Sequence, residues 1–322
     1  MGETKPLAPI GRARIGAYGR GRAATTATCL DHHPRGVELP INHLGAGAMG
    51  VRDDPFWEFE RSGWERAAAS YEDSWSGATR AYVEPLLSAA RVAPGVRLLD
   101  VACGPGYVAG AAAELGADAV GLDVAEEMVA RAAQRYAGVE FVVGDAHGLG
   151  FRDAAFDSVT MNFGIHHVAD PERVFREARR VLRPGGIYTF TSWAGGAEHA
   201  PIAIAEAAVL PNAVAVELPV GPDFLRFSDR ETCETVLPQA GFAPGSVTFE
   251  TVRTSWRIPH VGHLFDAQLK GGVRMAALLR AQPGDVLERI REAMILETRR
   301  YETTDGSCVL PIAAHVITAT AG

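Results

Sequence analysis

The chain has 322 residues, of which 47% are hydrophobic and 22% are charged, as is typical of a globular protein with a sizeable core. Its formal net charge of −8 disfavours nucleic acid as a partner, because binding to phosphates relies on a basic face. The four cysteines are widely scattered, and no segment has the ~20 consecutive apolar residues of a membrane span. We therefore expect a soluble, cytoplasmic protein with reduced thiols and no membrane partner, and we leave a homodimer open.

Residues 1–48 are rich in Gly, Ala and Arg and show neither helical nor strand periodicity. We expect a disordered leader there, followed by one domain over residues 49–322. The arginines and the few acidic residues resemble a transit peptide, whereas the frequent Gly and Pro argue against an amphipathic helix. Alternatively, natural translation begins at Met49.

From residue 55 to 90, apolar residues recur at helical spacing and predict two helices ahead of a sheet. Short apolar runs then predict strands at about 96–101, 119–124, 139–143, 159–163 and 187–191. Between the last two, a helix begins at Asp170-Pro171-Glu172 and ends before Pro184-Gly185-Gly186. Apolar strands that alternate with helices indicate an α/β fold with a parallel sheet covered on both faces.

The last third of the chain continues with a helical pattern to about residue 218, a loop at 221–224 and a helix at 228–240. A strand near 246–258, more helix over 261–301 and a final strand at 309–320 follow. Helices inserted between late strands would lie over the edge of the sheet. We expect them to form a substrate lid, with elements at about 194–245 and 259–303.

The first predicted strand runs into a tight turn, Asp100-Val101-Ala102-Cys103-Gly104-Pro105-Gly106. Glycines there let the backbone approach a ligand closely, and the next helix offers unpaired N–H groups. A dinucleotide-binding turn would have a third glycine where Ala109 stands. Asp100 would direct its carboxylate at a cation such as an ammonium group, which argues against a nicotinamide cofactor.

Two further carboxylates end the next two predicted strands. Asp123 closes the second strand, where an acid commonly accepts from both hydroxyls of a ribose. Asp145 closes the third strand, where it could accept from an adenine amino group while the N–H of Ala146 donates to the ring. Each aspartate could instead cap the following helix, but three acids at successive strand ends favour a ligand site.

Taken in order, these motifs resemble the class I methyltransferases that use S-adenosylmethionine (SAM). The resemblance is to the small-molecule branch, with ubiquinone and menaquinone C-methyltransferases and natural-product O-methyltransferases. It covers about residues 64–193 and includes Gly121-Leu122-Asp123, Gly144-Asp145-Ala146, Phe156-Asp157 and Leu182-Arg183-Pro184-Gly185-Gly186. It implies a Rossmann-like seven-stranded fold with N-terminal helices, SAM as cofactor and a small-molecule acceptor. His147 and Gly150 depart from the acid and proline often seen there, which weakens assignment to a subfamily.

The resemblance also implies residue roles. Gly104 and Gly106 would line the methionine portion of SAM, Met128 would pack on adenine, and Asn162 and Phe163 would contact the methionine end. Tyr71 looks like an aromatic that these proteins place over SAM, or else is a core residue. The expected cofactor contacts are Tyr71, Asp100, Ala102, Cys103, Gly104, Gly106, Asp123, Val124, Met128, Asp145, Ala146, Asn162 and Phe163.

Methyl transfer to a hydroxyl or an enolisable carbon can require a general base. His166 and His167 are the candidates, because they follow the fourth predicted strand and histidine titrates near neutral pH. Adjacent residues in extended chain point to opposite sides, so we expect one of them, preferably His167, to face the pocket. Alternatively, both pack around the helix that begins at Asp170.

The acceptor pocket is predicted to be aromatic with one cationic contact. Its candidate residues are Trp193, His199, Phe224, Phe227, Trp256, Phe265 and Arg274. No metal site is expected. Two other functions stay open: a SAM-binding protein without catalysis and, less favoured, a nicotinamide-dependent dehydrogenase.

Overall fold

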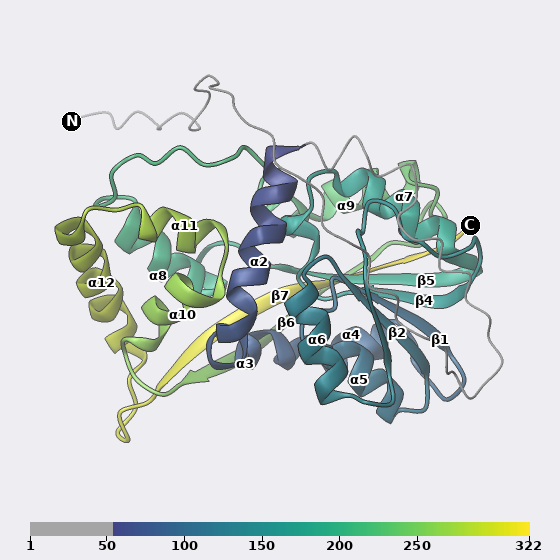
Figure 1. The fold of residues 1–322 in the computed structure, drawn as a ribbon, viewed down its shortest axis with the longest axis horizontal. Helices are drawn as coiled ribbons and strands as arrows, with labels where there is room; N and C mark the ends of the chain where they lie inside the picture. Colours follow the sequence, from purple (N-terminus) through teal and green to yellow (C-terminus); the bar gives the residue numbers. More distant parts are fainter. Residues whose placement is uncertain (1–53) are drawn as a thin grey trace, which may run out of the picture. The chain divides into compact units, whose positions relative to one another are not determined.

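A computed structural model describes residues 54–322, so the predicted leader at 1–48 lies outside the described residues. The described chain contains a seven-stranded sheet of order β3-β2-β1-β4-β5-β7-β6 (Figure 1). Its strands are β1 (Arg97–Val101), β2 (Asp118–Asp123), β3 (Glu140–Val143), β4 (Phe156–Met161), β5 (Leu182–Trp193), β6 (Thr248–Ile258) and β7 (Cys308–Thr320). The first five strands are parallel, and β7 runs antiparallel between β5 and β6. The Rossmann-like, seven-stranded fold expected from the sequence is confirmed.

Helices cover both faces of this sheet, as continuous apolar strands require. The helices α4 (Val83–Ala89) and α5 (Tyr107–Glu114) lie on one face, and α7 (Pro171–Val181) and α9 (Arg230–Gln239) lie on the other (Figure 1). The helix α6 (Glu126–Arg135) packs against β2 and β3. The side chain of Asp170 accepts from the amide of Arg173 and caps α7 as predicted.

The N-terminal helix α2 (Pro55–Ser74) begins after Asp54, whose side chain accepts from the amide of Phe56 at 2.8 Å. Pro55 occupies its first turn, where a missing N–H costs nothing. The helix packs against α6 on one side and α10 (His263–Gly271) on the other (Figure 1). The short helix α3 (Ser76–Thr79) follows it directly. The chain thus places α2 beside the glycine-turn half of the sheet.

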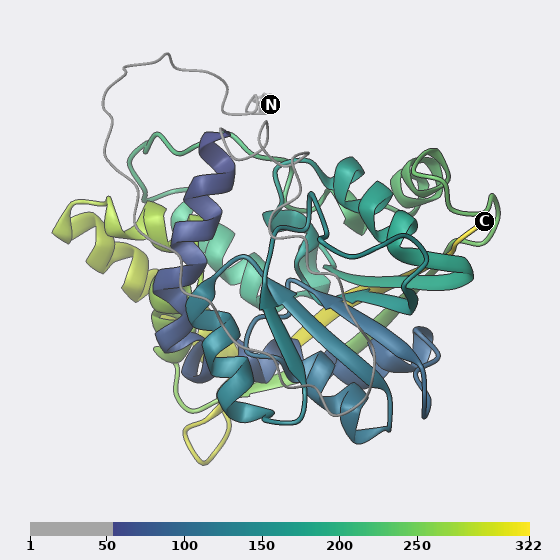
Figure 2. The ribbon, with the colours of Figure 1, turned by 45° about the vertical axis from the view of Figure 1, so that its right-hand side comes forward.

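Four helices gather at the far end of β6 and β7 (Figures 1 and 2). They are α8 (Ala200–Val209), α10, α11 (Arg274–Arg280) and α12 (Gly284–Thr298). Their buried apolar side chains form one cluster with Trp193, Trp256 and Leu310 of the strands. By contrast, α9 lies beside α7. The predicted lid element at about 194–245 contains both α8 and α9, so the structure divides it between the helical cluster and the face of the sheet covered by α7. The lid role of α8 and α10 to α12 stays a prediction.

Two boundaries differ from the prediction. The strand β4 begins at Phe156 rather than 159, and β5 begins at Leu182, so the predicted helix stop Pro184-Gly185-Gly186 lies within β5. Phe156 pairs with Leu182 and Ser158 pairs with Ile187, with the register shifted between them. The exposed residues 183–185 therefore bulge from a strand that continues on both sides.

The predicted helix from residue 194 to about 218 is also wrong at its end, because α8 stops at Val209. Pro211 follows two residues later and has no N–H to continue the hydrogen-bond ladder. Within the described chain, no helix is long and apolar enough to cross a bilayer.

Candidate active site

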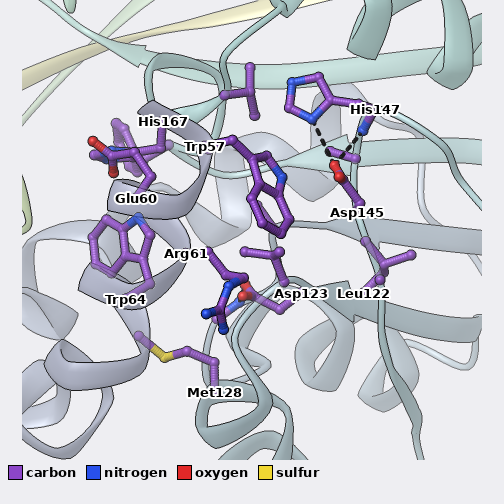
Figure 3. A pocket seen from close by; sticks show the side chains of 18 of the residues that line it. Trp57, Glu60, Arg61, Trp64, Leu122, Asp123, Met128, Asp145, His147 and His167 are labelled. Carbon is purple, nitrogen blue, oxygen red and sulfur yellow. Dashed lines mark hydrogen bonds and ion pairs between the residues drawn. The ribbon is translucent and has the colours of Figure 1, made fainter. Parts of the chain in front are cut away.

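A pocket lies at the carboxyl ends of β1, β2 and β4, with α2 as the opposite wall (Figure 3). The space inside it is about 760 Å³, a figure that includes the part open to solvent. Its lining residues are Trp57, Glu60, Arg61, Trp64, Tyr71, Ala102, Gly104, Leu122, Asp123, Val124, Met128, Gly144, Asp145, Ala146, His147, Phe163, Gly164, His167 and Val168.

The turn after β1 has an unusual backbone. Ala102, Gly104 and Gly106 all have positive φ, of 54°, 52° and 82°. A Cβ built on Gly104 would meet no atom within 4 Å, whereas one on Gly106 would lie 2.7 Å from the ring of Phe141. Gly106 is therefore required for packing beneath α5, and Gly104 leaves open space at the pocket wall. An alanine in the left-handed region costs about 1–2 kcal/mol, as strain at a functional site often does.

Asp123 connects the second strand to this turn. Its Oδ2 accepts from the amide of Gly104 at 2.8 Å, and its Oδ1 accepts from the amide of Ala125 at 2.9 Å. Burial raises the pKa of this carboxyl above its ordinary value, and the amides of Ala125 and Gly104 oppose that rise. Each carboxylate oxygen can accept more than one hydrogen bond, so both oxygens can still accept from a ligand in the pocket.

Asp145 is held by a neighbour that sequence reasoning had treated as a departure from the family pattern. The ring Nδ1 of His147 lies 2.7 Å from Asp145 Oδ1, and the amide of His147 donates to the same oxygen at 2.9 Å (Figure 3). The amide of Asp170 donates to His147 Nε2 at 3.1 Å. Since Nε2 accepts, the ring is neutral and Nδ1 donates to Asp145. This fixes the carboxylate at the end of β3.

The helix α2 contributes Trp57, Glu60, Arg61, Trp64 and Tyr71 to the pocket. Their spacing of three, four and seven residues places them on one face of a helix. Among these residues the sequence analysis selected Tyr71 as a cofactor contact, and it did not select Trp57, Glu60, Arg61 or Trp64 as site residues. The sequence did contain a signal that Glu60 is a site residue, because this carboxylate lies between two tryptophans on the apolar stripe of the helix.

The two candidate histidines are separated by the structure. His167 lines the pocket, and its Nδ1 lies 2.9 Å from Oε2 of Glu60. His166 is absent from the pocket lining, and its ring packs against Phe224 with centroids 4.3 Å apart. Burial, followed by the neighbouring His167, holds the pKa of His166 well below its ordinary value. His166 is thus a neutral packing residue in this structure, and His167 is the histidine that a ligand can reach.

Asp100 lies beneath the turn and is fully buried, with its Oδ1 accepting from the hydroxyl of Thr160 at 3.0 Å. Burial is the main cause that raises the pKa of this carboxyl to about 7, and the hydrogen bond from Thr160 opposes the rise. Asp100 is not among the pocket-lining residues. Asp100 therefore influences a cation in the pocket through the charge of its carboxylate and not by direct contact, because the backbone of the turn lies between them.

Three other predicted contacts lie outside the pocket lining: Cys103, Gly106 and Asn162. The side-chain Nδ2 of Asn162 donates to the carbonyl of Thr79 at 3.2 Å, and its Oδ1 accepts from the hydroxyl of Thr191 at 2.8 Å. It thereby connects the N-terminal helices to β5. The other predicted contacts, namely Tyr71, Ala102, Gly104, Asp123, Val124, Met128, Asp145, Ala146 and Phe163, line the pocket.

The aromatic residues predicted for the acceptor pocket do not converge there. Trp256 stacks on Trp75 in the helical cluster, with centroids 5.2 Å apart. Phe227 packs edge-on against Phe175 under α7. None of the predicted acceptor residues is in the pocket lining, and Trp193, Trp256 and Phe265 are buried in the helical cluster. The aromatic walls of the described pocket come from α2 and from Phe163 instead.

The pocket suits a cationic nucleoside. Glu60, Asp123 and Asp145 supply three carboxylates against the guanidinium of Arg61. Acceptor oxygens lie at the ends of β2 and β3, and Met128 lies buried beside Trp64 and Tyr71 as a surface on which a base can pack. The open space at Gly104 provides room next to the turn. These features fit SAM, which has an adenine, a ribose, a carboxylate, an ammonium and a sulfonium.

The sheet order and the pocket at its carboxyl edge define a class I methyltransferase domain, and comparison with known proteins agrees. Residues 99–190 match the family model described as a methyltransferase domain.

Curated relatives include a demethylmenaquinone methyltransferase of Renibacterium salmoninarum, 38% identical over 34% of this chain and 46% of its own length. One from Clavibacter sepedonicus is 41% identical over 35% of this chain and 44% of its own length. The chain thus spans about half the length of these relatives or less. The solved YcgJ protein of Bacillus subtilis superposes with a TM-score of 0.49, at 16% identity over 75% of this chain and 98% of that protein.

Proposed function

We propose that this protein transfers a methyl group from SAM to a small-molecule acceptor, on oxygen or carbon. The observation that carries the proposal is the convergence of Gly104, Asp123, Asp145 and His167 in one pocket. The first three are donors and acceptors suited to the nucleoside and methionine parts of SAM, and the last is a proton acceptor. A cytoplasmic location and a single domain with α8, α10, α11 and α12 as a lid belong to the same proposal.

When bound, SAM supplies a methyl group on a sulfonium, whose thioether is a good leaving group. The residues of the chain therefore contribute mainly position and exclusion of water. Asp123 would accept from the ribose hydroxyls, Asp145 and Ala146 would bind the edge of the adenine, and Met128 would pack on its face. Trp57 and Trp64 of α2 would close the pocket over the reacting groups.

The direct test is calorimetry with SAM, its demethylated product S-adenosylhomocysteine and NADH, followed by transfer of a tritiated methyl group to phenols, quinols, amines and carboxylates. Binding of SAM and its product without NADH, together with transfer to an oxygen or carbon acceptor, supports the proposal, whereas transfer to amines alone would contradict the proposed acceptor atom. Tight binding of NADH would favour a dehydrogenase. Binding of SAM without transfer to any acceptor would favour a non-catalytic SAM-binding protein.

A further inference from the structure

Glu60 is a buried carboxylate on the pocket face of α2. Its side chain is 3% exposed, and its Oε2 lies 2.9 Å from Nδ1 of His167, which is 20% exposed. Its second oxygen, Oε1, is buried and has no hydrogen-bond partner among the described residues. A buried carboxylate with so few partners is costly unless a positive charge compensates it. His167 is the group positioned to supply that charge.

The side chains around His167 determine whether an imidazolium formed during reaction meets an opposite charge. The ring contacts two titratable side chains, Glu60 and His166, and two neutral rings, Trp64 and Phe224. Burial keeps His166 neutral by lowering its pKa, so it adds no full charge against an imidazolium. Trp64 meets the ring edge-on with centroids 4.8 Å apart and restricts its rotation. Glu60 is thus the full charge in direct contact with the His167 ring among these four side chains.

The hydrogen bond to Glu60 also selects the nitrogen that reacts. In neutral imidazole one nitrogen donates and the other accepts. Since Nδ1 faces a carboxylate, Nδ1 carries the hydrogen and Nε2 is the acceptor. Nε2 has no hydrogen-bond partner among residues 54–322 that competes with a ligand for it.

We infer that Glu60 is a positioning residue that orients His167 as the general base for an acceptor with a phenolic or enolic hydroxyl, an inference that rests on the proposed methyl transfer. The acceptor O–H bond breaks and its proton moves to Nε2 of His167. The oxygen electron pair forms the bond to the methyl carbon, and the carbon–sulfur bond breaks with its electron pair on sulfur. Glu60 then stabilises the imidazolium.

The acceptor class follows from the base. Imidazole removes a proton at moderate cost from a phenol, whose ordinary pKa is about 10, while a neutral amine attacks through its free lone pair and needs no prior deprotonation. Trp57 and Trp64 line the same pocket, and their rings provide flat apolar walls for a planar acceptor.

The first test needs neither SAM nor acceptor. The imidazole signals of His167 are followed by NMR against pH in ligand-free wild type, in Glu60→Gln and in the control Glu58→Gln, with His167→Gln to assign the signals. Glu58 lies two residues away on the same helix and pairs with Arg61 at the surface. We expect the His167 midpoint to move to lower pH in Glu60→Gln, because the carboxylate next to the ring is removed, and to stay unchanged in the control. An unchanged midpoint in a folded Glu60→Gln protein overturns the inference.

The second test is a double-mutant cycle on turnover with saturating SAM. Glu60→Gln alone should lower kcat by about 10-fold or more, shift the acid side of the pH–rate profile to lower pH and leave the KM for SAM unchanged. In the His167→Gln background the same change should cost less than about 2-fold, because Glu60 acts through the histidine. Additive losses would show that Glu60 acts independently and would overturn the positioning role.

These outcomes separate the inference from the proposed function. If the NMR midpoint shifts as expected but no acceptor is methylated, the proposed function fails while the Glu60–His167 pairing stands. If transfer occurs to amines and not to phenols or enols, methyl transfer stands and the base role of His167 falls.

Discussion

The carboxylate of Asp123 accepts a hydrogen bond from the backbone amide of Gly104 at 2.8 Å, so the end of β2 is connected directly to the glycine turn after β1. The same carboxylate accepts from Ala125 at the start of α6. Asp123 therefore sets the shape of the turn as well as offering oxygens to a ligand. A substitution there is expected to affect stability and affinity together, and the two effects can be measured separately.

Asp123→Asn is expected to weaken binding of S-adenosylhomocysteine and to lower the melting temperature. The amide side chain has one donor end, which must face either an N–H of the turn or the ligand. A lost hydrogen bond to a charged group costs about 1.5–3 kcal/mol, or roughly 10- to 150-fold in Kd. Calorimetry checks the affinity, with Asp118→Asn at the exposed start of the same strand as control. Wild-type affinity in Asp123→Asn would rule out the ribose assignment.

The two glycines of the turn should respond differently to alanine. Gly106→Ala places a Cβ 2.7 Å from Phe141 and 2.9 Å from Ala132, at a residue with positive φ. The backbone strain and the overpacking together should lower the free energy of unfolding by several kcal/mol. Gly104→Ala meets no atom within 4 Å and should cost only about 1–2 kcal/mol of strain. Its Cβ enters the pocket, however, and should reduce SAM affinity. Denaturant unfolding measures the stability of both variants, and calorimetry measures their affinity for SAM. A Gly104→Ala protein that is less stable than Gly106→Ala would contradict this prediction.

His167→Gln is expected to lower turnover by about 10²- to 10⁴-fold at saturating SAM, while SAM affinity stays near that of the wild type. His166→Gln should instead lower the melting temperature, because His166 is buried against Phe224, and change turnover only a few fold. Steady-state kinetics and thermal unfolding on the two variants distinguish these effects. A large turnover loss in His166→Gln with normal stability would contradict the separation drawn from the structure.

Asp100 should make the stability of the protein depend on pH. Its pKa is raised from an ordinary value of 3.8 to about 7 by burial, so the folded state binds its proton more tightly than the unfolded state does. The resulting stabilisation is fully present below about pH 4 and is lost as pH rises through about 7. Asp100→Asn, which cannot ionise, should therefore lose less unfolding free energy than the wild type between pH 5 and 8. Denaturant titrations across that range measure the unfolding free energy of both proteins. If it depends on pH in the same way in wild type and in Asp100→Asn, folding does not raise the pKa of Asp100.

The amino-acid sequence by itself determined the parallel half of the sheet and the acids at its edge. The strands ending at Val101, Asp123 and Val143 were predicted to within about two residues, because short apolar runs between helical patterns and glycine turns are local signals. The same locality explains why Asp123 and Asp145 could be assigned to one pocket, since the carboxyl ends of neighbouring parallel strands meet at one edge.

Only the tertiary structure decided what completes the pocket. Glu60 precedes His167 by 107 residues, and their contact depends on how α2 packs across the sheet, which no local pattern encodes. The position of Trp256 also depends on long-range packing. The sequence analysis placed it among the acceptor contacts, whereas in the structure it stacks on Trp75. An aromatic side chain gains similar burial energy in a core or at a pocket wall, so its sequence position alone does not distinguish them. The long-range packing of helices decides which carboxylate meets which histidine.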